Sequence, residues 1–369
     1  MSAFSQRAER LRARLPSRQV DLLVVSKLVN VRYLTGFTGT NGICVVGPSG
    51  GAFVTDFRYV EQAGEQVPDY ELRVGKDDML EAVAAAVREL GADRAGEHVG
   101  LPRLGFDDAT ITVRAHRRLG ELLEGAAELV PAPGLVEELR AVKDAEEIDA
   151  IRRATALADT TYEWLAAEHG LAGHTERDAA FALEMHAREL GAEAVAFPPI
   201  VAAGAHGALP HATPRDVEIP NDTLVVVDFG CTVDGYNSDC TRTFATGEVD
   251  TEARECYELV KAAQQTALER ARAGADVREV DGAARELIER AGHGERFGHG
   301  VGHGVGLEVH EGPRLAPTAN GRLNARNVVT IEPGVYLPER FGVRIEDLVV
   351  VDGDDPEILT TVSKDLTEV

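Results

Sequence analysis

The chain has 369 residues, of which 44% are hydrophobic and 27% are charged, as in ordinary globular proteins. This composition excludes disordered, collagen-like and disulfide-scaffold classes, and the length suggests two domains. The 38 basic and 62 acidic side chains give a formal charge of −24, which argues against binding to nucleic acid or to an anionic membrane surface.

The four cysteines include no CxxC pair and are too few for a disulfide framework, so we expect a reducing cytoplasm. No apolar run reaches the roughly 18 residues of a transmembrane helix, so we expect no membrane association. The Arg-rich start could be a transit peptide. Its apolar residues recur at helical spacing, however, which favours an amphipathic first helix with one apolar face, formed by Phe4, Ala8, Leu11 and Leu15.

Strand and helix signals alternate in the first third of the chain. Strands are predicted at 21–26, 43–47, 52–56 and 98–102, with a Pro-Ser-Gly-Gly hairpin turn between the second and third. Helices are predicted at 77–90, ended by Gly91, and at 109–124. The pattern predicts an α/β domain, and we place its boundary at the Pro-Ala-Pro-Gly segment, which gives domains 1–131 and 132–369.

The remainder of the chain begins with helices and continues with strands. Asp144 followed by Glu147 is a capping pattern that predicts the start of a long helix, and a second helix is expected at about 175–190. Strands and Gly-rich turns follow, interrupted by helices at about 251–273 and 277–291. Helices followed by hairpins predict an α+β domain with a largely antiparallel sheet.

An acid at the end of an apolar strand is the first candidate site feature. Asp228 ends the run Leu-Val-Val-Val, and such a carboxylate is costly to bury unless it is paired, hydrogen-bonded or metal-bound. If the chain turns between Asp234 and Gly235, Asp228 faces Thr241 and Asp239 is its diagonal neighbour on the same face. The alternative is a turn Asp and a surface Asp.

Two glutamates flank a second predicted hairpin. If the turn lies near Glu339 and the hairpin is regular, Glu332 and Glu346 are directly opposed. Like charges across a strand pair repel, and a dication would compensate them. The alternative is a slipped register with one Glu in solvent.

The Gly/His segment at 298–310 contains His299, His303 and His310 among glycines that allow close backbone approach. It fits neither GxGxxG nor HExxH, and it contains no P-loop. Histidines near buried acids suggest metal ligation or acid–base chemistry, the alternative being a His-bearing turn. Four carboxylates and one imidazole would suffice for two divalent ions such as Mn²⁺ or Co²⁺, which can hold a bridging hydroxide.

The segments VDFG…SDCTRTF, GHGVGHGVGLEVHE, TIEPGVY and VRIEDLVVV resemble the successive motifs of the pita-bread metallopeptidases, which include prolidase, aminopeptidase P and methionine aminopeptidase. The resemblance implies that fold and two metal ions per chain. It implies Asp239 and Glu346 as bridging ligands, Asp228 as a ligand of one metal, and His303 and Glu332 as ligands of the other.

The same resemblance implies roles for residues that bind substrate. His211, in VAAGAHGALPHATP, and His310 would hydrogen-bond substrate carbonyls or the tetrahedral intermediate. Glu332 would accept the proton of the bridging water and pass it to the leaving nitrogen. Arg344 lies two residues before Glu346, so the alternation of a strand places it on the same face, where it could neutralise the site. Tyr336 would line the wall of the site or belong to the core.

VRYLTGFTGTNGICVV and FVTDFRYVEQA resemble the creatinase/prolidase N-terminal domain, which simple methionine aminopeptidases lack. This domain and the intact ligand set imply a cytoplasmic Xaa-Pro peptidase, usually a homodimer in this family. Mn²⁺ is the expected metal, although Co²⁺, Fe²⁺ and Zn²⁺ accept the same ligands. A same-fold aminopeptidase of broader specificity and a non-catalytic peptide-binding homologue are the alternatives.

Proline lacks an N–H and has a fixed φ, so a specialised site should close on its ring. We expect an apolar pocket around His211 and His310, with Phe197 or Tyr336 nearby. Arg314 could receive the carboxylate of a dipeptide, or it could be an exposed loop arginine. The sequence leaves dipeptidase and aminopeptidase activity open.

Overall fold

The computed structural model describes residues 2–92, 100–353 and 355–369. Its contacts divide the chain into two compact units, Met1–Arg140 and Ala141–Val369. The domain boundary after residue 131 remains a prediction. None of the helices in the described residues is long and apolar enough to cross a membrane.

The first unit is built on a six-stranded mixed sheet with the order β4-β3-β2-β1-β5-β6. The predicted hairpin is confirmed, because β2 and β3 pair antiparallel, whereas β5 pairs parallel with both β1 and β6. The strands are β1 (Leu22–Val25), β2 (Ile43–Val46), β3 (Gly51–Thr55), β4 (Glu71–Val74), β5 (Arg103–Phe106) and β6 (Glu128–Pro131). The helices are α1 (Ala3–Arg12), α2 (Leu28–Thr35), α3 (Val60–Gln66), α4 (Met79–Ala92), α5 (Val113–Leu122) and α6 (Leu135–Arg140), with 3-10 turns at Leu15–Arg18 and Phe57–Tyr59.

Two local predictions in this unit were wrong. The strand expected at 98–102 begins only at Arg103; residues 98–99 lie outside the described residues. Pro102 has no N–H for the ladder, and β5 is flanked by strands on both sides, so the strand cannot include it. Gly91 does not end α4 but lies inside it, where a Cβ would lie 3.1 Å from Cγ of Pro102. There the glycine allows close packing of the helix.

In the second unit, every pair of named strands in the described residues is antiparallel, as predicted. Its helices are α7 (Ala145–Trp164), α8 (Glu176–Glu189), α9 (Thr251–Leu268) and α10 (Val277–Arg290). Its strands are β7 (Ala194–Val195), β8 (Ile200–Ala203), β9 (Leu224–Asp228), β10 (Cys231–Val233), β11 (Tyr236–Asn237), β12 (Thr241–Ala245), β13 (Gly302–Gly304), β14 (Glu311–Leu315), β15 (Val328–Ile331), β16 (Gly334–Leu337), β17 (Phe341–Arg344), β18 (Asp347–Val350) and β19 (Glu357–Ile358). A π-helical turn at Leu165–His169 and 3-10 turns at Gly204–Ala208 and Gly294–Arg296 complete it.

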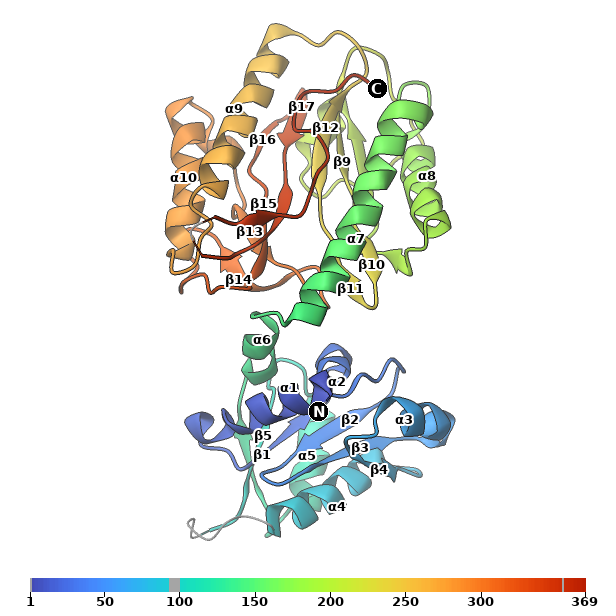
Figure 1. The fold of residues 1–369 in the computed structure, drawn as a ribbon, viewed down its shortest axis with the longest axis vertical. Helices are drawn as coiled ribbons and strands as arrows, with labels where there is room; N and C mark the ends of the chain where they lie inside the picture. The colour runs from blue at the N-terminus through green and yellow to red at the C-terminus, as the bar shows by residue number, and fades with distance from the viewer. Residues whose placement is uncertain (1, 93–99, 354) are drawn as a thin grey trace. The chain divides into compact units, whose positions relative to one another are not determined.

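Helices flank the strands of the second unit on two sides, with α7 and α8 on one side and α9 and α10 on the other (Figure 1). The predicted capping box is present at the start of α7, since Asp144 accepts from the N–H of Glu147 and Glu147 accepts from that of Asp144. One apolar core joins α7 and α8 to β8, β9 and β12, and another joins α9 and α10 to β15–β18. The strands with the acidic residues are therefore held from both sides.

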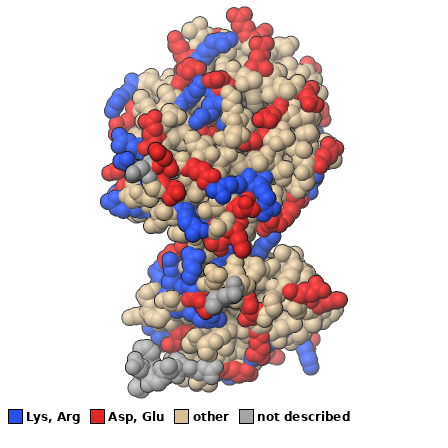
Figure 2. Space-filling view, in the orientation of Figure 1, with Lys and Arg blue, Asp and Glu red and all other residues tan. Residues whose placement is uncertain are grey.

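Acidic and basic side chains are interspersed over both units on the face shown in Figure 2. Among the described residues, neither sign gathers there into one continuous field. The excess of acidic residues therefore does not form a continuous negative surface on this face that would indicate a positively charged binding partner.

Candidate metal centre

The first pair of acids lies where the sequence predicted it. β9 and β12 pair with Asp228 opposite Thr241, and β10 and β11 turn at Asp234 and Gly235. Both turn residues have positive φ, 51° and 78°, as a two-residue hairpin turn requires. Asp239 is buried and lines the same cavity as Asp228, which excludes the reading of a turn Asp and a surface Asp.

The second pair of acids, Glu332 and Glu346, lies between strand pairs whose registers are regular and consistent with each other. Ile331 pairs with Asp347 on one side of Glu332 and Glu346, and Gly334 pairs with Arg344 on the other. The two glutamate N–H groups do not bond across this pair but donate to the carbonyls of Val301 and Thr241. The ladder therefore opens at the two acids, and the predicted opposition holds without a slipped register.

His303 reaches these acids from β13. Its Nδ1 lies 3.1 Å from the carbonyl oxygen of Gly304, which can only accept, so Nδ1 carries a proton and donates it. Nε2 then faces the acids, 3.2 Å from Glu332 Oε1 and 3.7 Å from Asp239 Oδ2. A Cβ at Gly302 would lie 1.9 Å from the carbonyl oxygen of Thr330, so glycine is required here for close approach of the strands.

The cluster concentrates negative charge in a buried place. Burial, together with the nearby carboxylates, raises the pKa of Asp239 and of Glu346 well above the usual values. Burial also raises the pKa of Asp228, against the attraction of Arg344. Burial also acts to raise the pKa of Glu332, but the hydrogen bond with His303 and the positive charges of His303 and Arg344 together outweigh burial and lower this pKa. Together these acids favour a cation.

The donor atoms fit a divalent metal. Ligand atoms of Asp239, His303 and Glu346 lie within 4.8 Å of one another. Asp228 Oδ1 and Glu346 Oε1 are buried and have no hydrogen-bond partner among the described residues. Buried acceptors are ordinarily satisfied, so these two oxygens are suited to coordinating a metal.

Arg344 joins the two carboxylate pairs from the side of β17. It donates from Nη2 to Asp228 Oδ2 over 2.7 Å and from Nε to Thr241 Oγ1 over 2.9 Å. Because the Thr241 hydroxyl accepts from Arg344, its own proton is free to go to Glu346 Oε2, 2.7 Å away. The hydroxyl thus orients a proposed ligand, a role that the sequence reading missed although it placed Thr241 opposite Asp228.

A further chain of hydrogen bonds runs away from the acids. Arg344 Nη1 donates to the Tyr336 hydroxyl over 2.9 Å, and this hydroxyl lies 2.9 Å from His299 Nε2. His299 Nδ1 donates to the carbonyl oxygen of Gly300, so Nε2 accepts from Tyr336. Burial lowers the pKa of His299, which keeps the ring neutral for this arrangement. Tyr336 thus lines the cavity and also supports Arg344.

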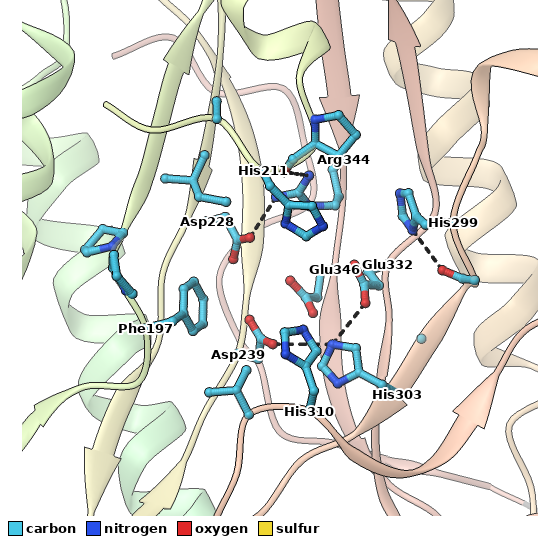
Figure 3. Close-up of a pocket in the computed structure, with 18 of the residues that line it drawn as sticks. Phe197, His211, Asp228, Asp239, His299, His303, His310, Glu332, Arg344 and Glu346 are labelled. Carbon is cyan, nitrogen blue, oxygen red and sulfur yellow. Dashed lines mark hydrogen bonds and ion pairs between the residues drawn. The ribbon is translucent and has the colours of Figure 1, made fainter. Parts of the chain in front are cut away.

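The acids open into a cavity with a volume of about 840 Å³. In Figure 3 the four carboxylates point toward one another, with Phe197 on one side and His303 on the other. His310 lies against His303, with 4.3 Å between the ring centroids. Burial lowers the pKa of His310, which favours a neutral ring at the cavity. The wall carries several prolines and other apolar residues: Pro198, Pro199, Ile200, Pro210, Pro214, Val309 and Ala316.

The structure brings all the predicted site residues to this cavity: His211, Asp228, Asp239, His303, His310, Arg314, Glu332, Tyr336, Arg344 and Glu346. Their catalytic and binding roles remain predictions. Sequence reasoning missed two buried carboxylates nearby, Glu176 and Glu311. Glu311 pairs with buried Lys143, and the two lie 168 residues apart, so no local pattern could indicate the contact.

Two family models match the chain. The model of metallopeptidase family M24 matches residues 149–353, and that of the creatinase/prolidase N-terminal domain matches residues 7–142. The Xaa-Pro dipeptidase of Pyrococcus furiosus is 33% identical over 98% of this chain and 100% of its own length. An uncharacterised peptidase of Bacillus subtilis is 36% identical over 97% of this chain and 98% of its own.

Solved structures agree. The Xaa-Pro dipeptidase from Bacillus anthracis has a TM-score of 0.93 and 36% identity, covering 99% of this chain and 100% of that one. The X-Pro aminopeptidase from Thermotoga maritima has a TM-score of 0.87 and 33% identity, covering 98% of this chain and 100% of that one. The similarity therefore includes both units.

Proposed function

The chain belongs to metallopeptidase family M24, with a creatinase/prolidase N-terminal domain ahead of the pita-bread unit, and from this premise we propose that it hydrolyses Xaa-Pro bonds. The observation that supports this most directly is the convergence of five ligand-type side chains on a cavity whose wall is rich in proline and other apolar residues. The full-length similarity to an Xaa-Pro dipeptidase points to the same substrate class.

We propose that two divalent ions are held by Asp228, Asp239, His303, Glu332 and Glu346, with Asp239 and Glu346 shared between them. Ions bound there would supply an activated bridging hydroxide and stabilise the developing oxyanion. The positive charge of ions bound there would also keep Glu332 ionised, as a proton acceptor must be. Glu332 would take the proton of the attacking water and pass it to the proline nitrogen.

His211 and His310 are the proposed substrate-binding histidines. Both line the cavity on its exposed side, and neither ring is held by a hydrogen bond among the described residues. Each ring can therefore turn its N–H toward a substrate carbonyl oxygen or the tetrahedral intermediate. The Phe197 ring and the prolines of the wall offer apolar surface for the pyrrolidine ring.

Arg314 favours dipeptides among the possible Xaa-Pro substrates. It lies on β14, lines the cavity and has no ion-pair partner among the described residues. A guanidinium in this state can bind the free carboxylate that follows directly after proline in a dipeptide. A longer peptide places an amide there instead.

A substrate comparison tests the proposal. Protein stripped with a chelator and reloaded with Mn²⁺ should hydrolyse Ala-Pro, hydrolyse Ala-Pro-Ala less efficiently, and leave Ala-Ala largely intact. Equal cleavage of Ala-Ala would favour an aminopeptidase of broader specificity. Less than one metal ion per chain, with no cleavage of either proline peptide, would favour a non-catalytic peptide-binding protein.

We also propose Mn²⁺ as the metal because the ligand set is rich in oxygen, a homodimer as the assembly from the family resemblance, and the cytoplasm as the location from the use of cysteine. The four cysteines are buried free thiols, as suits a reducing compartment. Elemental analysis of protein purified without added metal tests the first statement. Light scattering tests the second, since a monomer at micromolar concentration contradicts it.

A further inference from the structure

The buried carboxylate of Glu176 holds both ends of the segment that carries His211, residues 203–215. Glu176 Oε1 accepts from the N–H of Ala203 and from Arg215 Nη2, at 3.0 and 2.9 Å. Oε2 accepts from the N–H and from Nε of Arg215, both at 3.0 Å. His206 Nδ1 donates between the two oxygens, at 3.0 and 2.9 Å. The start, the 3-10 turn and the end of segment 203–215 thus meet at one side chain.

The placement of Glu176 is unusual for its position in the chain. It is the first residue of α8, where an acid ordinarily faces solvent and the positive end of the helix dipole. Here it is 1% exposed. Burial raises its pKa, but the hydrogen bonds from Arg215, Ala203 and His206 outweigh burial and leave the pKa below the usual value. The buried charge is therefore stabilised only while these donors stay in place.

The segment between the two anchored ends forms one wall of the cavity. Pro210, His211, Ala212, Thr213 and Pro214 all line it. His211 makes no hydrogen bond among the described residues that would fix its ring. Within the described residues, the polar contact that joins this stretch to the residues of the metal centre is the one from Arg344 Nη1 to the carbonyl oxygen of Pro210, at 3.2 Å. The position of His211 thus depends on how the segment ends are held.

We propose that Glu176 is a positioning residue that holds the His211 segment in the geometry that binds the peptide. The proposal rests on the proposed function and identifies a side chain outside the cavity that controls substrate affinity. Glu176 touches neither the cavity nor the acids of the metal centre, so its effect must pass through segment 203–215.

The variant Glu176→Gln tests this with little change in volume. The amide places an NH₂ group against the donors of Arg215, so hydrogen bonds to a charged group are lost. We expect KM for Ala-Pro to rise about tenfold, kcat to change less than about threefold, and metal content to stay the same. Glu184→Gln is the matched control, because Glu184 lies on the same helix and makes a part-exposed ion pair with Arg188. It should leave all three quantities unchanged.

Hydrogen exchange gives a readout that does not depend on turnover. Amides of residues 203–215 should exchange faster in Glu176→Gln, while α9 and α10 stay protected. His206→Asn, which can keep a donor near the Nδ1 position, should be close to wild type, whereas His206→Ala should resemble Glu176→Gln. Circular dichroism and thermal unfolding show whether each variant is folded.

The proposal is overturned if Glu176→Gln leaves KM and the exchange of 203–215 unchanged. It is equally overturned if kcat and metal content fall while KM rises, or if Glu184→Gln has the same effect as Glu176→Gln. If wild-type protein cleaves no proline peptide, the proposed function fails separately. Faster exchange of 203–215 would then still support the anchoring role, and unchanged exchange would refute it.

Discussion

Arg344 donates from Nη2 to Oδ2 of Asp228 over 2.7 Å, while Oδ1 of the same carboxylate has no hydrogen-bond partner among the described residues. One oxygen is therefore held by the protein and the other is directed at the cavity. Because Asp228 and Arg344 lie on different hairpins, β9–β12 and β16–β17, the contact also joins the two halves of the acid cluster.

Replacement of Arg344 by lysine keeps the positive charge and removes the planar arrangement of donors, so it tests whether the hydrogen bonds of Arg344 are needed for activity. Lysine cannot reach Asp228, Thr241 and Tyr336 at once, since it lacks the planar fork of donors. We expect turnover of Ala-Pro to fall about 100-fold, equivalent to ~3 kcal/mol. Arg340→Lys is the control, because Arg340 lies in the exposed turn of the same hairpin and pairs with Glu252. Wild-type turnover in Arg344→Lys would contradict the assigned role.

Asp239→Asn should lose a metal ion as well as activity. The amide removes a charge from a position proposed to be shared by both ions, so metal content should fall by about one ion and activity by at least about 100-fold. Elemental analysis after Mn²⁺ loading and desalting measures the first effect. Asp234→Asn, in the exposed hairpin turn nearby, should retain both ions because asparagine tolerates positive φ. Full metal content in Asp239→Asn would refute the bridging position.

Arg314→Ala should separate dipeptides from longer peptides. Loss of a charge-assisted contact with the free carboxylate should raise KM for Ala-Pro about 10- to 100-fold. KM for Ala-Pro-Ala should change much less, because its carboxylate lies one residue further on. The two substrates thus serve as controls for each other. A similar rise for both would mean that Arg314 acts on the wall of the cavity and does not select the carboxylate.

Asp159 in α7 predicts a pH dependence of stability away from the cavity. Its Oδ2 accepts from Thr361, Oδ1 is buried without a hydrogen-bond partner in the described residues, and burial raises its pKa above the usual 3.8. The folded state therefore binds the proton more tightly than the unfolded state. Stability from this group is present below pH 3.8 and is lost as pH rises through the folded pKa.

Asp159→Asn removes the charge and keeps an acceptor for Thr361. The variant should unfold at a higher temperature than wild type at pH 7, and the difference should vanish near pH 3.5. Differential scanning calorimetry of metal-free protein at both values measures this. A variant that is less stable than wild type at pH 7 would show that the charged form of Asp159 is favoured in the fold.

The sequence by itself determined the positions of the acids. The alternation of a strand has a period of two, and a two-residue turn sets the register, so Asp234-Gly235 was enough to place Asp228 opposite Thr241. The opposition of Glu332 and Glu346 followed in the same way from the turn near Glu339. These relationships are local, and local geometry is what residue spacing encodes.

Only the tertiary structure decided which distant groups meet. Glu176 binds Arg215 across 39 residues, and Arg344 reaches Asp228 across 116. Such contacts depend on how hairpins and helices pack. Residue spacing does not predict which group a charged side chain will contact when the two lie so far apart in the sequence. The start of β5 at Arg103 also depends on tertiary structure. Pro102 is excluded from the strand because β5 lies between β1 and β6 in the sheet, where proline cannot donate to the ladder. Residue spacing predicted where the acids of the site lie, whereas tertiary packing determined which residues hold these acids and the His211 segment in place.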